Sequence, residues 1–372
     1  MAWDPNVSQA QFLRQLDLAG NIVRETNMGV IQHELVARGA SDGGPCTAIP
    51  SPPPVGAACA GAFHDDAIQT LPNGYTAALI DIEKIFPPGT QGDTSGLPVD
   101  IIGEMIIVLD AHWQVVWWAE FEAQLASPAA TLGETCGTTT AGCPPIFLLG
   151  PGIAPLAHDW LDADSLYYWP APQNGSSKGN IIMSARNQDL VLNVDYQDGA
   201  GTGDILWRMG SRGNFTFNNL YNDPWPWFSH QNDAGIQNGG AGPMTIMDNG
   251  NTRVTSLGNA CGPYDCDSRG MALSIAYNAS AGKGTVTPVV SLDLGAYSSN
   301  YGSAELRSDG HSFFENAMVS VPAQNSTFGY SLEIGPAPAA PQAGAAGVLL
   351  DMAGPPHYRG WQMPSLYNPP TT

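Results

Sequence analysis

Positive charge is the scarcest feature of this 372-residue sequence: Lys and Arg total 13, and three of these are lysines. Asp and Glu total 34, so the formal net charge is −21 at pH 7. Proteins bind nucleic acids and anionic membrane surfaces through clusters of Lys and Arg. The sequence therefore predicts that the chain binds no nucleic acid and no anionic membrane surface.

Long apolar runs are also lacking. No stretch of about 18 consecutive apolar residues occurs, which predicts that no segment spans a membrane. The first residues, MAWDPNVSQAQFLRQLD, contain neither a basic region nor an apolar core of the kind found in signal peptides. We therefore expect that any signal peptide is absent from this chain and has already been removed.

The six cysteines form three close pairs, each in a loop rich in Gly and Pro. No Cys-x-x-Cys spacing and no spacing with histidine accompanies them, so zinc is the weaker of two interpretations. Three loop-closing disulfides would require an oxidising compartment, which predicts a secreted, periplasmic or extracellular protein. The predicted pairs are Cys46 with Cys59, Cys136 with Cys143, and Cys261 with Cys266.

The residues that are abundant indicate β-structure. Hydrophobic residues make up 43% of the chain, and it contains 43 glycines and 31 prolines, as in a turn-rich globular protein. Short runs of Val, Ile, Leu, Tyr and Trp are separated by Asn-Gly or Asp-Gly, which is typical of β-hairpins. A helical period of 3.6 residues is visible only around 29–39 and 118–127.

Pairs of hairpins recur at a spacing of roughly 60 residues, which favours a β-propeller. We predict an all-β protein, a six-bladed β-propeller of four-stranded antiparallel blades, forming a single domain over residues 1–372. Residues 1–28 would contribute a strand segment to blade closure. A pair of β-sandwiches is the weaker alternative, because no Pro/Ser linker divides the chain into halves.

Six motifs then occur in a fixed order: LPNG, DWLDADS, SARNQD, ILWRMG, WFSHQND and DNGNTR. With them, the chain from LDLAGNIVRETN to YRGWQMPSLY resembles the bacterial arylsulfotransferase family. The resemblance implies a six-bladed propeller that moves a sulfuryl group from a phenolic sulfate to a phenol, with no cofactor required. It also implies that one histidine takes the sulfuryl group covalently, while other histidines and an arginine neutralise charge.

Three of the four motifs that line the family's channel depart from the family pattern. Before LPNG, the second of two adjacent histidines is replaced by Asp65. In DWLDADS, the histidine position is Asp162 and the following asparagine position is Asp164. The position of the nucleophile is Asn232, and only Arg186 matches its motif. These substitutions favour a catalytically degenerate, secreted binding or structural module.

The alternative is an active enzyme whose site has shifted. His230 lies two residues before Asn232, and on a strand both would point to one face. A site built from His64, His158, Arg186 and His230 would then act on a phenolic sulfate and a phenol. Against this alternative, two strand residues span roughly 6.6 Å, whereas catalysis tolerates displacements of about an ångström.

The substitutions also add acids to the expected channel: Asp65, Asp66, Asp162 and Asp164. Oxygen ligands that converge in this way suit Ca²⁺, which is the metal we predict for this set. The competing interpretation is that these aspartates are solvated or paired with Arg186.

Self-association is a further expectation. The apolar loops at 49–61 and 335–344 are rich in Pro and Ala, and the chain has few of the lysines that keep strand edges apart. We expect these loops, or the N-terminal segment 2–15, to contact neighbouring copies of the chain.

Overall fold

The computed structural model describes residues 11–47, 54–90, 94–121, 134–136, 157–171, 175–220, 222–253, 266–307, 309–321, 325–335 and 348–360, with backbone alone at 65–67, 134–136, 238 and 321. The chain divides into two compact units. Unit 1 comprises Met1–Ala163 and Asp198–Ile205, and unit 2 comprises Asp164–Gln197 and Leu206–Thr372. That residues 1–372 form one propeller domain stays a prediction.

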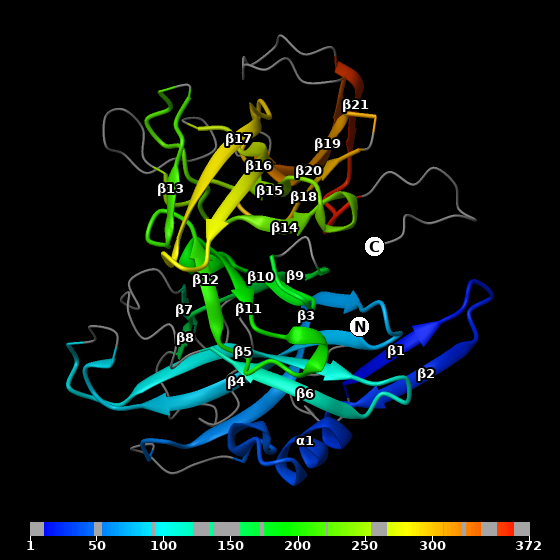
Figure 1. Cartoon of the computed structure of the whole chain (residues 1–372), viewed down its shortest axis with the longest axis vertical. Helices are drawn as coiled ribbons and strands as arrows, with labels where there is room; N and C mark the ends of the chain where they lie inside the picture. Colours follow the sequence, from blue (N-terminus) through cyan, green and yellow to red (C-terminus); the bar gives the residue numbers. More distant parts are fainter. Residues whose placement is uncertain are drawn as a thin grey trace. The chain divides into compact units, whose positions relative to one another are not determined.

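Unit 1 is built on a sheet with the strand order β3-β4-β5-β8-β7, in which β6 also pairs with β5 (Figure 1). Its strands are β3 (Ala58–Thr70), β4 (Thr76–Phe86), β5 (Val99–Leu109), β6 (Val115–Glu120), β7 (Glu134–Cys136) and β8 (Ala157–Asp159). All of β5 and most of β4 are buried, which explains why their sequences are nearly continuous apolar runs. The acids within these two strands are therefore conspicuous.

The N-terminal part of unit 1 is a two-stranded ribbon followed by a helix. Its elements are β1 (Phe12–Leu16), β2 (Ile22–Asn27) and α1 (Met28–Ala37). The Asn27 side chain accepts a hydrogen bond from the Val30 N–H and so caps α1. The buried face of α1 packs into one apolar cluster with β3–β6. The helical period at 29–39 is confirmed, whereas that at 118–127 is wrong for 118–120, which belong to β6.

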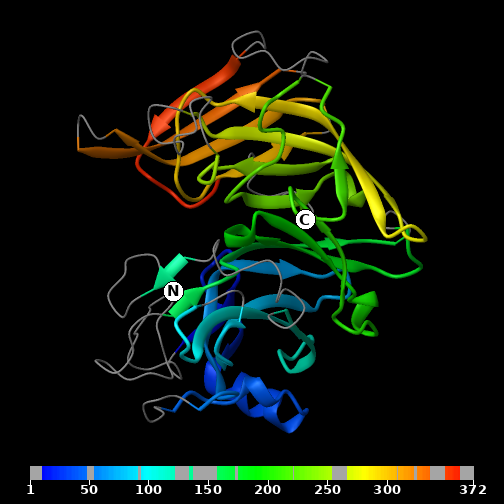
Figure 2. The same cartoon turned by 90° about the vertical axis from the view of Figure 1, so that its left-hand side faces the viewer.

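Unit 2 carries three further sheets, with the orders β12-β11-β10-β9, β13-β17-β16-β15-β14 and β18-β19-β20-β21. Figure 2 shows β16 and β17 in yellow and the third sheet mainly in orange. The strands are β9 (Ala163–Trp169), β10 (Asn180–Ala185), β11 (Leu190–Val194), β12 (Ile205–Met209), β13 (Phe215–Phe217), β14 (Asn232–Ile236), β15 (Met244–Asp248), β16 (Arg269–Asn278), β17 (Lys283–Asp293), β18 (Ser303–Leu306), β19 (Ser312–Val321), β20 (Ser326–Ile334) and β21 (Val348–Gly354). Short 3₁₀ turns connect some of the elements: η2 (Ser41–Gly43), η5 (Arg186–Gln188), η6 (Gln197–Gly199) and η7 (Asn238–Gly240).

Two apolar clusters join these three sheets in succession. The first packs β9–β12 against β13–β17 and includes Trp169, Trp207 and Phe215. The rings of Trp207 and Phe215 meet edge to face at 5.1 Å between centroids. The second cluster packs β15 and the end of β17 against the third sheet through Met247 and Phe314. Sheet-on-sheet packing thus forms the core of unit 2.

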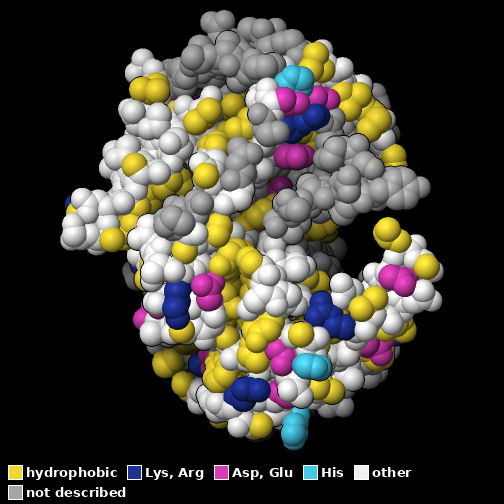
Figure 3. Space-filling view, turned by 45° about the vertical axis from the view of Figure 1, so that its right-hand side comes forward, with side chains coloured by type: hydrophobic (Ala, Val, Ile, Leu, Met, Phe, Trp, Pro, Cys, Tyr) yellow, Lys and Arg dark blue, Asp and Glu magenta, His cyan; other side chains and the backbone are white. Residues whose placement is uncertain are grey.

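The prediction of an all-β protein is confirmed, because the described residues form antiparallel sheets of four to six strands with few parallel pairings. Closure into a six-bladed propeller stays a prediction, as does the part of residues 1–28 in it. No helix in the described ranges has the length and apolar character needed to cross a membrane. The face drawn in Figure 3 carries few Lys and Arg side chains, in keeping with the composition.

The predicted disulfide between Cys46 and Cys59 is confirmed. Cys266 is also disulfide-bonded. The side chains of Cys136, Cys143 and Cys261 lie outside the described residues, so the other two pairings stay predictions.

Candidate functional site

His230 lies in the turn before β14 and is held by one carboxylate. Its backbone N–H donates to Asp189 Oδ1 at 2.7 Å, and its ring Nδ1 lies 3.0 Å from the same oxygen. These contacts hold His230 at φ 45°, a left-handed conformation that residues other than glycine seldom adopt. The expectation that a strand would carry His230 and Asn232 on the same face is wrong, because β14 begins only at Asn232.

Asp189 closes the turn that follows β10. It ends η5 with φ 51°, and its N–H donates to the Arg186 carbonyl at 3.1 Å. Thr252 Oγ1 donates to the second carboxylate oxygen of Asp189 at 3.0 Å. Because an ionised carboxylate only accepts, the neutral His230 ring carries its proton on Nδ1 and its lone pair on Nε2. Within the described residues Nε2 has no hydrogen-bond partner, so its lone pair is available for chemistry.

Two arginines flank this turn. Arg186 is 4% exposed, and its Nη2 donates to the Ser299 carbonyl at 2.9 Å. Arg212 donates to the Gln188 carbonyl at 2.7 Å. Partial burial lowers the pKa of the Arg212 guanidinium, while the Asp189 charge acts to raise it. The Asp189–His230 pair thus has guanidinium groups close to its own turn.

A phenol, that of Tyr297, lies near Arg186 and a third arginine, Arg253. Burial raises the pKa of the Tyr297 hydroxyl, and the charges of Arg186 and Arg253 act in the opposite direction. The effect of both arginines on one phenol places the two guanidinium groups in a common region of unit 2. Positive side chains of this kind stabilise bound or developing anions.

Asn232, at the position expected for the family's nucleophile, belongs to a buried amide network. Its Nδ2 donates to Asn249 Oδ1 at 2.9 Å, and it is 1% exposed. Asn249 in turn donates to the carbonyls of Ser298 and Tyr301 at 2.9 and 3.0 Å. This network connects the start of β14 to the segment 298–301, which follows β17. The side chain at position 232 is an amide, which is not a nucleophile.

Asp164, one of the predicted Ca²⁺ ligands, already has partners on both carboxylate oxygens. It accepts from Ser184 Oγ at 3.1 Å and from the Asp233 N–H at 3.2 Å. Its Oδ1 also lies 3.6 Å from an Arg359 guanidinium nitrogen. Asp164 is therefore tied into the framework of unit 2.

The remaining predicted residues lie in unit 1. His158 is half-buried on β8, and His64 is buried on β3 with its Nδ1 3.1 Å from Asp81 Oδ1. Glu104 pairs directly with Asp81 across β4 and β5. Ligand atoms of His64, Asp81 and Glu104 all lie within 4.8 Å of one another, so these three residues could hold a metal ion.

Further acids surround this group. Burial raises the pKa of Glu104 to about 8, opposed by His64 and reinforced by Asp81 and Asp162. Burial also raises the pKa of Asp159 well above its ordinary value, with Asp162 and Glu104 adding to the rise. Asp162 therefore acts on the acids of unit 1. The side chains of Asp65 and Asp66 lie outside the described residues.

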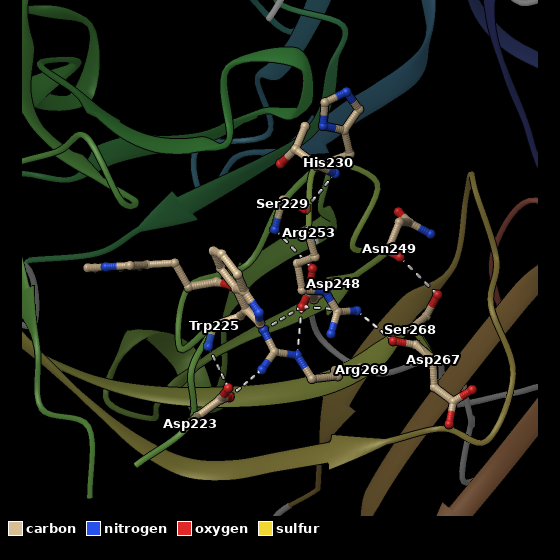
Figure 4. Close-up of polar contacts among 12 residues, drawn as sticks. Asp223, Trp225, Ser229, His230, Asp248, Asn249, Arg253, Asp267, Ser268 and Arg269 are labelled. Carbon is tan, nitrogen blue, oxygen red and sulfur yellow. Dashed lines mark hydrogen bonds and ion pairs between the residues drawn. The ribbon is translucent and has the colours of Figure 1, made fainter. Parts of the chain in front are cut away.

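A separate pocket of about 620 Å³ opens in unit 2, with Trp225, Arg253 and Arg269 in its wall. Figure 4 shows Arg269 between two aspartates. Arg269 donates to Asp248 at 2.8 Å and to Asp223 at 2.7 Å. The His230 ring points away from this group in Figure 4, and His230 does not line the pocket. The pocket is therefore distinct from the Asp189–His230 pair.

Comparison with known protein families identifies the family of this chain. The model of the arylsulfotransferase (ASST) family matches residues 9–342, which is most of the chain. The chain belongs to the arylsulfotransferase family. No curated protein matches it. The resemblance carried by the six ordered motifs is thereby confirmed.

Sequence reasoning missed several residues of this arylsulfotransferase-family chain. Asp189 lies inside the SARNQD motif, but its contact with His230 joins positions 41 residues apart and leaves no local pattern. Asp81 and Glu104 did leave a signal: both are acids within the apolar runs ALIDIEKIF and DIIGEMIIVL. An acid in a strand buried on both faces indicates a paired or liganded group.

Proposed function

We propose that this arylsulfotransferase-family chain transfers a sulfuryl group from a phenolic sulfate to a phenol, and that His230 is its nucleophile. One observation carries the proposal: the Asp189 carboxylate contacts both the backbone N–H and the ring Nδ1 of His230. An imidazole fixed in this way presents a basic Nε2 in a defined direction, which is how an adjacent carboxylate prepares a catalytic histidine.

In the first half-reaction, Nε2 attacks the sulfur of the aryl sulfate. The N–S bond forms, the bond between sulfur and the phenolic oxygen breaks, and the phenolate leaves and takes a proton from solvent. The His230 ring then carries positive charge, which the Asp189 carboxylate stabilises through the Nδ1 proton. The guanidinium groups of Arg186 and Arg212 would lower the cost of the developing negative charge.

In the second half-reaction, the oxygen of an acceptor phenol attacks the sulfur. The N–S bond breaks, its electron pair returns to Nε2, and the phenol proton passes to solvent. The ring is again neutral with its proton on Nδ1, so one cycle consumes no cofactor. The charges of Arg186 and Arg253, which act to lower the pKa of the Tyr297 phenol, would also favour ionisation of an acceptor phenol bound beside them.

A degenerate binding or structural module is the alternative, and the substitution at Asn232 favours it. Asn232 donates to Asn249 and offers no nucleophile, so activity would require another residue in that role, which we propose is His230. The two functions differ in one simple measurement, since only the enzyme releases phenolate from an aryl sulfate when a phenol acceptor is present.

The test is an assay with p-nitrophenyl sulfate as donor and a second phenol as acceptor, followed by absorbance of p-nitrophenolate. We expect turnover in the unmodified protein and a loss of about 10³-fold or more in His230→Ala. His112→Ala is the matched control, because His112 also lies beside an aspartate but is 86% exposed in its side chain. Absence of turnover in the unmodified protein would establish the degenerate module instead.

We further propose that the sheets are blades of a six-bladed propeller and that the protein works outside the cytoplasm. Family membership supports the first proposal, and the Cys46–Cys59 disulfide supports the second. A crystal structure and fractionation of the native host would test them.

Self-association through the N-terminal segment also remains a proposal. The described part of the ribbon exposes Phe12, Leu16 and Leu18, with Leu18 96% exposed. Light scattering across a range of concentrations would test it, and a monomer throughout would contradict it.

A further inference from the structure

The buried acids of unit 1 come together by strand pairing. Asp81 on β4 is the direct partner of Glu104 on β5, so their side chains leave the same face of the sheet. His64 enters from β3, and Asp159 ends β8, which runs parallel to β5. All four residues are at most 7% exposed. Four different strands thus deliver one imidazole and three carboxyl groups to a single buried place.

Full ionisation would leave the charges of this buried group unbalanced. Asp81, Glu104 and Asp159 would then carry three negative charges. His64 can supply one positive charge at most. Uncompensated carboxylates in the interior cost several kcal/mol each, so buried charges are normally paired or bound to a metal. A divalent cation would supply the missing positive charge.

Two geometric observations indicate a ligand. Ligand atoms of His64, Asp81 and Glu104 lie within 4.8 Å of one another. Ligands on opposite sides of an ion with bonds of about 2.1–2.4 Å are about 4.2–4.8 Å apart, so one ion can reach all three. In addition, Glu104 is fully buried, and its Oε2 has no hydrogen-bond partner among the described residues. Its other oxygen accepts from the Ala163 N–H at 3.2 Å, which fixes the carboxylate.

We propose that His64, Asp81 and Glu104 bind one divalent metal ion, with Asp159 as a neighbouring buried carboxyl group. The imidazole decides the class of ion. Ca²⁺ takes ligands that are almost all oxygen, whereas one imidazole with two carboxylates suits first-row ions such as Mn²⁺ and Zn²⁺. The contact between His64 and Asp81 would also orient the ring, as carboxylates commonly do for metal-binding histidines.

This site uses different residues from the Ca²⁺ site expected from the sequence, whose ligands were Asp65, Asp66, Asp162 and Asp164. The site also does not rest on sulfuryl transfer, since every ligand lies in unit 1 and His230 lies in unit 2. Its role is structural: the ion would fasten β3, β4 and β5 together.

The experiment uses full-length protein without a histidine tag, treated with EDTA and dialysed. Mn²⁺ is titrated in, and the free ion is followed by its electron paramagnetic resonance signal, with thermal unfolding measured in parallel. We expect one Mn²⁺ bound per chain, displacement of that ion by Zn²⁺ but not by an equal concentration of Ca²⁺, and a higher melting temperature in the loaded protein.

Glu104→Gln removes one ligand while keeping the shape of the side chain. It should weaken Mn²⁺ binding at least about tenfold and leave the melting temperature of the metal-free protein equal or higher, because one buried ionisable group is gone. Asp100→Asn is the matched control, since Asp100 lies on the same strand outside the group. His230→Ala should bind Mn²⁺ normally, which separates this proposal from the proposed activity.

Three outcomes would overturn the proposal: no saturable binding of Mn²⁺ or Zn²⁺ by the unmodified protein, saturable binding of Ca²⁺ alone, or equal Mn²⁺ affinity in Glu104→Gln and the unmodified protein. If Glu104→Gln failed to fold, the same titration of Asp81→Asn would decide, with binding at full affinity again counting against the site.

Discussion

His230 and His64 have the same immediate partner but opposite surroundings. Each has its Nδ1 within 3.1 Å of an aspartate carboxylate, His230 with Asp189 and His64 with Asp81. Around His230 the further charged groups include guanidinium groups, and around His64 they are carboxylates. The two oriented imidazoles therefore suit different ligands: an anion at His230 and a cation at His64.

The difference lies in the charge of the ligand that can approach Nε2 of each ring. Near arginines, a basic Nε2 can attack an anionic sulfate, because the positive charges offset the approach of two electron-rich groups. Among carboxylates the same approach would be strongly repelled, whereas a cation would be attracted. The charges around each histidine, more than the Asp–His contact itself, decide which chemistry it can support.

The largest expected effect comes from breaking the pair in unit 2. Asp189→Asn keeps the shape of the turn but can donate to Nδ1, which would move the ring proton to Nε2 and remove the nucleophile. We expect turnover of p-nitrophenyl sulfate to fall by about 10²–10⁴-fold. Asp110→Asn, beside the exposed His112, is the control and should leave turnover within about twofold. Equal rates in both variants would remove His230 from the mechanism.

The second prediction compares a buried ion-paired group with an exposed ion pair. Arg269 is 5% exposed in its side chain and lies between Asp223 and Asp248, so Arg269→Ala leaves buried Asp248 without its main partner. We expect a loss of about 3–5 kcal/mol in the free energy of unfolding. Arg14→Ala, which removes an exposed pair with Glu25, should cost about 1 kcal/mol or less. Denaturant unfolding measures both, and equal losses would contradict the contrast.

The third prediction concerns pH and unit 1. Burial, together with Glu83, raises the pKa of Asp100 from 3.8 to about 8. The folded chain therefore keeps a proton that the unfolded chain releases, so this contribution to stability is complete below pH 3.8 and is lost as pH rises toward 8. The slope is at most about 1.4 kcal/mol per pH unit. Asp100→Asn should flatten the pH dependence of the melting temperature, and an unchanged slope would contradict the assignment.

The smallest expected effect tests local structure at the start of α1. The Asn27 side chain accepts from the Val30 N–H at 3.0 Å, so Asn27→Ala should cost about 1 kcal/mol. Asn27→Asp preserves the acceptor and should cost less, as thermal unfolding would measure. A larger loss in Asn27→Asp than in Asn27→Ala would exclude capping as the role of this residue.

Local parts of the fold were predictable because local patterns encode them. The β-hairpins follow from short apolar runs with Gly at the turns, as in LPNG between β3 and β4, where Gly74 has φ 78°. The helix over Met28–Ala37 was visible from its period. The parallel pairing of β5 with β8 was not predictable, since it joins Ile101 to His158 across a long connection. Pairings of that kind depend on the packing of the whole unit.

The candidate sites were predictable only in part. The sequence placed Arg186 and His230 among the important residues, but it assumed that a strand carries His230 to the face of Asn232. The left-handed turn at His230 is stabilised by its contact with Asp189. No local sequence pattern predicts that contact, because the two residues are 41 positions apart. The grouping of Asp81 with Glu104 follows from the register of β4 against β5. The apolar pattern helps to set that register, but the register cannot be read from the sequence alone.

The most direct test of the contrast between the two histidines is to trap the covalent intermediate. The protein is mixed with p-nitrophenyl sulfate in the absence of acceptor, quenched rapidly in alkali, digested and mapped by mass spectrometry. We predict one sulfuryl group per chain, located on His230 and absent from the His230→Ala variant. A sulfuryl group on His64, or no modified histidine in a protein that turns the substrate over, would contradict the assignment of anion chemistry to His230.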